Sequence, residues 1–285
     1  MYQNWTLFIQ QYSLGIQKKL ALFTEYFKNR SLERVHVVFI DNTFDTYSFS
    51  PIQAESILVV SSHAQIEFLE SADRKQEYIV DIFVLDRTKV NVLVNHKNVN
   101  STYRFFLGQG AQLHFGMTIV DVNQSVIKII CHLLGTESCA NLKVVSLLND
   151  SQEVQLFTEQ HHHAVHTKSD LVLRGFVTHN AQILHQGIIT IDQQAQQTQA
   201  SQQSKILLGS ANAQAKSIPS LEIKAHDVRC QHGSAIGYLD EQQLFYLQSR
   251  GFDERAAQKM LVEAIFAEID VCLHEMLKEK IDKMF

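Results

Sequence analysis

The chain has 285 residues, of which 45% are hydrophobic and 19% charged, and its formal net charge is −5. This length supports one large domain or two small ones, and the acidic balance without a dense Lys/Arg cluster argues against a general nucleic-acid binder. The sequence contains no apolar run of about 18 residues and no secretory signal at its start, so we expect no membrane span and a cytoplasmic protein.

Residues 1–34 are predicted to form an N-terminal helical segment. Aromatic and aliphatic residues recur there at steps of three and four, which places one apolar stripe on a helix. The stripe consists of Phe8, Tyr12, Ile16, Leu20, Phe23 and Phe27.

From residue 35 to residue 225 the sequence reads as one strand after another. Runs such as Val35–Ile40, Ile57–Val60 and Tyr78–Leu85 are rich in β-branched and aromatic residues, which is typical of strands. No amphipathic helical stripe of useful length interrupts these runs. A fold with crossover helices between the strands is therefore excluded.

The spacing of the strands favours a solenoid. Four candidate strand centres follow one another at almost equal steps: Val92, Leu113, Leu133 and Val154. A near-constant step of this kind indicates coils that stack on one another. We predict a mainly β protein with a right-handed parallel β-helix over residues 35–225, and an antiparallel sandwich is the alternative. We interpret the glutamine-rich stretch Gln193–Ser204 as a polar turn and an outward strand face.

Residues 226–285 are predicted to form a C-terminal helical subdomain. Asp240 is placed to cap a helix that Gly251 ends in a left-handed turn, and Asp253 is placed to cap a second, longer helix. The second helix has a broad apolar face from Ala257 to Leu277. This face needs the end of the β-helix, a partner protein, or both to cover it.

Cys230 and His232 are the first candidate site. Residues two apart in an extended strand share a face, and a thiolate with an imidazole can bind iron. Judged by these residues alone, a buried structural cysteine beside a surface histidine is the better interpretation. One cysteine and one histidine cannot complete a four-ligand site, so a stable metal site here needs a second chain.

The second candidate is the histidine cluster of His161, His162, His163 and His166. His161 and His163 share a face of a strand, and two imidazoles on one face can bind zinc or another divalent ion. A polar outward strand that binds nothing is the alternative, and we favour it. The four cysteines are too scattered for a disulfide framework or a zinc finger: Cys131, Cys139, Cys230 and Cys272.

No catalytic motif stands out in the sequence. It lacks a glycine-rich phosphate loop before a helix, a nucleophile elbow and a zincin-type helix motif. We therefore do not expect an enzyme.

Two stretches resemble a known family. Ala225–Gly233 (Ala-His-Asp-Val-Arg-Cys-Gln-His-Gly) and Leu239–Gly251 are similar to the C-terminal signature of the SufB/SufD scaffold proteins of SUF iron–sulfur cluster assembly. The likeness is greatest to SufD. SufB-like members carry a cysteine where this chain has the region of Gln203, and a glutamate where it has Gly233.

The resemblance implies a scaffold subunit that pairs with a SufB-like subunit through its β-helix and docks a SufC-like ATPase on its C-terminal helices. It implies that His232 is a cluster ligand or assembly residue, with Cys230 as a weaker candidate. It further implies a transient iron–sulfur cluster in place of a tightly bound cofactor. The predicted docking residues are Leu244, Tyr246, Leu247, Arg250 and Gly251.

Two further expectations complete the analysis. A surface that pairs with a homologous β-helix can also pair with itself, so we expect a homodimer when the chain is alone. The alternative function is a metal-dependent β-helix enzyme that uses the cluster from His161 to His166.

Overall fold

The computed structural model describes residues 35–40, 46–49, 55–68, 77–97, 99–267, 269 and 271–285. The N-terminal helical segment expected over residues 1–34 lies outside these ranges. Within them the chain forms sixteen strands and three helices. No helix of the described ranges is both long and apolar enough to cross a bilayer.

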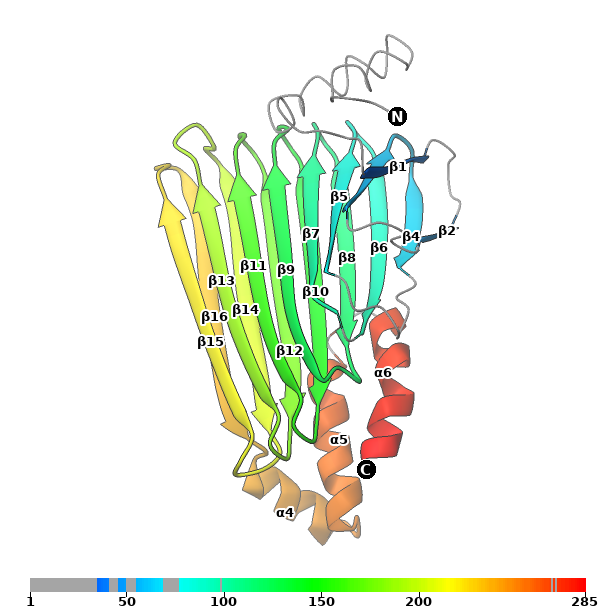
Figure 1. Cartoon of the computed structure of the whole chain (residues 1–285). Coiled ribbons are helices and arrows are strands. Elements are labelled where there is room, and N and C mark those ends of the chain that lie inside the picture. The colour runs from blue at the N-terminus through cyan, green and yellow to red at the C-terminus, as the bar shows by residue number, and fades with distance from the viewer. Residues whose placement is uncertain are drawn as a thin grey trace.

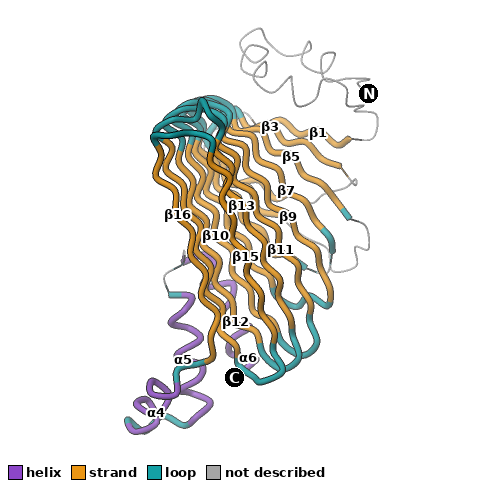
Figure 2. The backbone as a smooth tube through the Cα atoms, turned by 90° about the vertical axis from the view of Figure 1, so that its left-hand side faces the viewer, coloured by secondary structure: helices purple, strands orange, loops and turns teal. Residues whose placement is uncertain are grey.

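The strands form two sheets that face each other, and the strands within each sheet are parallel (Figures 1 and 2). The odd-numbered sheet consists of β1 Val35–Ile40, β3 Glu55–Val60, β5 Tyr78–Val84, β7 Ser101–Leu107, β9 Gln124–Leu133, β11 Glu153–His162, β13 Gln182–Ile191 and β15 Gln214–Ile223. The even-numbered sheet consists of β2 Thr46–Phe49, β4 Ala64–Phe68, β6 Lys89–His96, β8 Gln112–Ile119, β10 Cys139–Leu148, β12 Lys168–Val177, β14 Thr198–Leu208 and β16 Val228–Tyr238. Each coil contributes one strand to each sheet, so the predicted parallel β-helix is confirmed and the antiparallel sandwich is wrong.

The coil length differs from the predicted repeat. Leu113 and Leu133 lie in β8 and β9, which belong to opposite sheets, so the spacing between them does not measure one coil. The strand register does measure it, and the sequence separation of paired residues grows along the chain. The pairs that show this are Val35 with Glu55, Cys139 with Lys168, and Thr198 with Val228. The coils therefore lengthen toward the C-terminal end.

The core lies between the two sheets. Because successive side chains of a strand point to opposite faces, alternate residues such as Val90, Val92 and Val94 are fully buried in it. Most of the left-handed residues at the corners between the strands are not glycine, which explains how few glycines the fold needs. These residues are Arg87, Asp121, Glu137, Asp150, His166, His179 and Gln197.

Three helices follow the last strand: α4 Glu241–Ser249, α5 Glu254–Phe266 and α6 Val271–Met284. Asp240 caps α4 by accepting hydrogen bonds from the amides of Gln242 and Gln243, as predicted. Gly251 adopts a left-handed φ of 96°, and Asp253 caps α5. The single long helix expected after Asp253 is wrong, because the chain leaves the helical path after α5 and starts α6 at Val271.

The helices α5 and α6 cover the outer face of the even-numbered sheet (Figure 1). Phe266, Leu273 and Leu277 are fully buried there in a second core with Leu147 and Phe176. The helices thus pack on the side of the β-helix and leave its end open. The boundary expected at residue 226 is too early, because β16 continues the sheet through Tyr238.

We predict that Phe266→Ala destabilises the protein by about 3–5 kcal/mol, because it opens a cavity in the second core. Phe245→Ala is the matched control. Phe245 lies on the neighbouring helix α4 and is 73% exposed, so this substitution should change the free energy of unfolding by no more than about 0.5 kcal/mol. Urea unfolding of both variants measures the difference. Equal losses would contradict the packing of α5 on the sheet.

Candidate functional site

Cys230 and His232 lie on β16, the edge strand of its sheet. In β14 the inward residues Ala200 and Gln202 are buried, and the register pairs them with Cys230 and His232. Paired residues of adjacent strands point to the same face, so Cys230 and His232 share a face, as predicted, and they point toward the core. Because β16 is the last strand, this face is the open end of the core.

The open end of the β-helix is partly apolar. Exposed apolar side chains lie on β15 and β16: Leu221 and Ile223 are 37% and 40% exposed, and Ile236 and Tyr238 are 41% and 61% exposed. Figure 1 shows these two strands side by side at one end of the stack. Unpaired edge strands with exposed apolar residues are typical of an interaction surface.

Part of the core immediately inside the open end is polar. His185 bonds to the hydroxyl oxygens of Thr158 and Ser217 at 3.0 and 3.2 Å. Ser204 continues the network to Ser217 at 2.8 Å and to Ser234 on the edge strand at 3.0 Å. Burial lowers the pKa of His185 to about 4. The imidazole is therefore neutral at pH 7 and links the interior to the open end by hydrogen bonds.

The thiols at and near the site are not activated. Cys230 is half-buried and burial raises its pKa, so the thiol form prevails at neutral pH. Cys131 is buried in the core and Cys139 half-buried, and burial raises both of their pKa values. The side chain of Cys272 lies outside the described residues.

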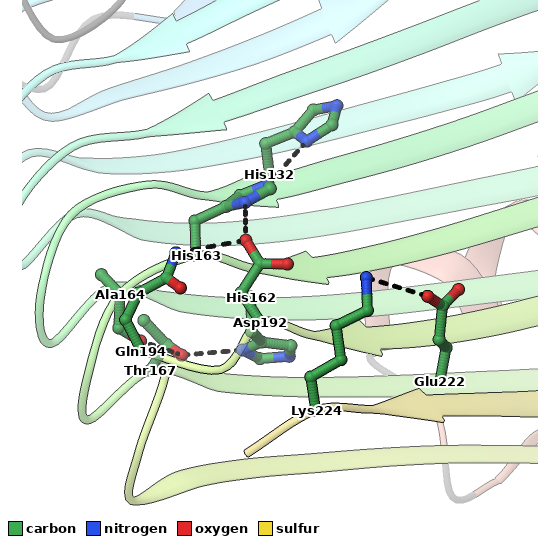
Figure 3. A network of polar contacts seen from close by, with 9 residues as sticks. All are labelled: His132, His162, His163, Ala164, Thr167, Asp192, Gln194, Glu222 and Lys224. Carbon is green, nitrogen blue, oxygen red and sulfur yellow. Dashed lines mark hydrogen bonds and ion pairs between the residues drawn. The ribbon is translucent and has the colours of Figure 1, made fainter.

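Two members of the predicted histidine cluster, His161 and His163, stack with His132. Figure 3 shows His132 and His163. His132 Nδ1 lies 3.2 Å from His163 Nε2, and His163 Nδ1 lies 2.8 Å from an oxygen of Asp192. His161 stacks on His132 with ring centres 4.8 Å apart and bonds to Glu159 at 2.7 Å. Burial, together with the neighbouring imidazoles, lowers the pKa of His132 to about 3.

His161 and His163 share a face, as predicted, whereas His162 and His166 lie apart from them. His162 points into the core, where it bonds to Thr167 and Ser169 at 2.8 Å, and His166 occupies a corner turn. Among the described residues, no group of three or more His, Cys, Asp or Glu side chains is arranged to hold a metal ion. The geometry therefore gives no support to the interpretation of these histidines as a metal site.

The predicted docking residues lie on and beside α4, a helix with no buried residue. Leu244 and Leu247 are half-buried, whereas Tyr246 and Arg250 are exposed, with the guanidinium 5.2 Å from the Tyr246 ring centre. Sequence reasoning missed Phe245, the most exposed large hydrophobic residue described. The signal was present in the sequence, because Leu244–Leu247 are four consecutive apolar or aromatic residues. Consecutive residues of a helix point in different directions, so a surface helix leaves some of them exposed.

The fold and the site define a class: a parallel β-helix protein with an open, partly apolar end that presents a cysteine and a histidine. The sequence model of one protein family, described as SUF system FeS cluster assembly, SufBD core domain, matches residues 44–265 of this chain. The chain belongs to this family, and its likeness is to SufD.

Named relatives agree with this assignment. The iron–sulfur cluster assembly protein SufD of Escherichia coli is 36% identical over 37% of this chain and 25% of its own length. SufD of Bacillus subtilis is 22% identical over 85% of this chain and 58% of its own length. The SufBD family protein slr0076 of Synechocystis is 24% identical over 76% of this chain and 52% of its own length. The chain thus spans about a quarter to three fifths of these relatives.

We predict that the pH dependence of stability reports the buried state of His185. The ordinary histidine pKa is about 6.5 and burial lowers it to about 4, so the unfolded chain binds more protons between these values. Stability is then lost as the pH falls from about 6.5 to about 4. Between pH 7 and 5 the wild type should lose about 2 kcal/mol more than His185→Gln.

Urea unfolding at both pH values measures this loss. His226→Gln, at an exposed histidine, serves as the control and should follow the wild type. Parallel pH curves for His185→Gln and the wild type would contradict the prediction.

Proposed function

We propose that this protein is a SufD-like scaffold subunit of the SUF iron–sulfur cluster assembly complex. The observation that carries the proposal is the position of Cys230 and His232 on the open end of the β-helix, whose two edge strands also carry exposed apolar side chains. A binding surface and a partial ligand set occupy the same place. The cluster is the cargo of this site and not a resident cofactor, and the chain itself is not an enzyme.

The open end is the proposed surface for a SufB-like subunit. The edge strands β15 and β16 have unpaired backbone groups on one side, and a second β-helix presents edges of the same geometry. Covering Leu221, Ile236 and Tyr238 would remove apolar surface from water. The partner would also supply the ligands that Cys230 and His232 lack. In the absence of that partner, a second copy of the chain is the proposed occupant.

Helix α4 is the proposed docking surface for a SufC-like ATPase. Phe245 and Tyr246 are exposed on it, and Phe252 follows at 42% exposure. Aromatic side chains that remain exposed beside a capped helix are typical anchors of a protein interface. We further propose that the protein acts in the cytoplasm.

We predict that the two surfaces can be disabled separately. Leu221→Glu places a charge in the open end and should abolish pairing with the SufB-like subunit while the SufC-like ATPase still binds. Phe245→Glu should do the reverse, because α4 lies outside the open end. Co-expression of the three proteins followed by size-exclusion chromatography measures both.

Met260→Glu is the control for this experiment, because Met260 is exposed on α5 at 40%, similar to Leu221. It should leave both associations intact. Failure of the wild-type chain to co-elute with either partner would overturn the proposed function.

We predict that His232→Ala lowers cluster formation without breaking the complex. Loss of a ligand should cost at least as much as loss of a supporting hydrogen bond at a metal site, about ten-fold. Iron and sulfide content of the purified complex measures the loss, and His226→Ala on the same terminal coil is the control. A His232→Ala complex with normal cluster content would remove His232 from the site.

A further inference from the structure

Gln202 lies directly beneath His232 in the core. The register of β14 and β16 pairs the two residues, and both belong to the inward face of their strands. Adjacent strands are about 4.8 Å apart, so same-face side chains at paired positions lie within reach of each other. The prediction that the glutamine-rich strand presents its glutamines outward is therefore wrong for Gln202, which is only 1% exposed.

The amide of Gln202 is an unusual feature of this core. Its Nε2 and Oε1 atoms are both buried, and neither makes a hydrogen bond within the described part of the chain. An unsatisfied buried amide costs about 1–3 kcal/mol, and such groups in native proteins call for an explanation. A leucine of similar volume would avoid this cost.

The opposite sheet makes room for this amide. A Cβ atom added to Gly187 would lie 2.0 Å from Nε2 of Gln202 and 2.6 Å from its Oε1. The absence of a side chain at Gly187 is thus what allows Gln202 to extend across the core. Pro219, which pairs with Gly187 in the next coil, has no N–H to offer.

The other inward neighbours of Gln202 do not hydrogen-bond to its amide. Leu171 pairs with it from below and is apolar, and Ala200 precedes it on the same face. Ser204 follows it, but that hydroxyl already bonds to two other serines. His232 is exposed and is the polar residue that the register places directly above Gln202 on the same face.

We propose that Gln202 is the positioning residue of His232: its Oε1 accepts a hydrogen bond from one ring N–H, so that the other nitrogen presents its lone pair at the open end. A metal-binding histidine needs this arrangement, because a hydrogen bond to one nitrogen determines the tautomer and the ring orientation. The inference rests on the proposed function only for its consequence in cluster assembly. In this structure the amide lies against Gly187 and makes no hydrogen bond. The proposed contact needs only a rotation of the Gln202 side chain toward β16 and no partner chain.

The first test is the tautomer of His232 in the isolated full-length chain. Long-range ¹H–¹⁵N spectra of ¹⁵N-histidine-labelled protein report it, and His232→Ala identifies the signal. The wild type should show one predominant tautomer, and Gln202→Leu should show a mixture. Gln202→Glu keeps an acceptor oxygen at this position and should restore the predominant form.

Gln160→Leu is the matched control. Gln160 is as deeply buried as Gln202 and its amide likewise makes no hydrogen bond among the described residues, but it pairs with Cys131 and Ile189, far from His232 in the register. This variant should leave the tautomer of His232 unchanged. Identical spectra for Gln202→Leu and the wild type, or an equal change in Gln160→Leu, would overturn the inference.

The second test uses the complex with the SufB-like and SufC-like partners. Gln202→Leu should lower cluster content about ten-fold while co-elution persists and the unfolding midpoint stays the same or rises, because an unsatisfied amide has left the core. A fall in cluster content that merely follows a loss of stability would contradict a positioning role. If the wild-type complex forms no cluster, the proposed function fails, and the spectra of the isolated chain still decide the role of Gln202.

Discussion

The register between successive coils is the constraint on which this structure depends. Every inward side chain stacks on the residue one coil earlier, so the core is a set of columns that run along the β-helix. A column continues only as long as each new coil supplies a residue that fits the one beneath it. The column Leu171–Gln202–His232 shows the consequence, since an apolar residue, a buried amide and an exposed imidazole follow one another within three coils.

This change of polarity connects stability with function. The early coils are filled with valine, isoleucine and aromatic side chains, whereas the last coils contain His185, Gln202 and a network of serine hydroxyls. Polar groups in a core cost stability unless they are hydrogen-bonded. Their concentration beneath the open end is the expected pattern when a core has to support a site as well as hold the fold together. The helices α5 and α6, which cover the side of the sheet, supply a second apolar core that is independent of this end.

Much of the fold could be predicted, because it rests on local patterns. The strand runs, the helix caps at Asp240 and Asp253 and the left-handed Gly251 were all legible in the sequence. The coil length could not be predicted, because strands of the two sheets follow one another in the chain and have the same alternating sequence pattern. The break between α5 and α6 was missed because both helices continue the same apolar periodicity.

The sequence by itself determined the strand-rich class, the capped helices and the pair Cys230 and His232, because alternation, capping and motif spacing are local properties. Only the tertiary structure decided that this pair faces an open end, that His161 and His163 stack on His132, and that Gln202 lies beneath His232. Those facts depend on the register between successive coils, which pairs residues far apart in the chain and which no local pattern encodes.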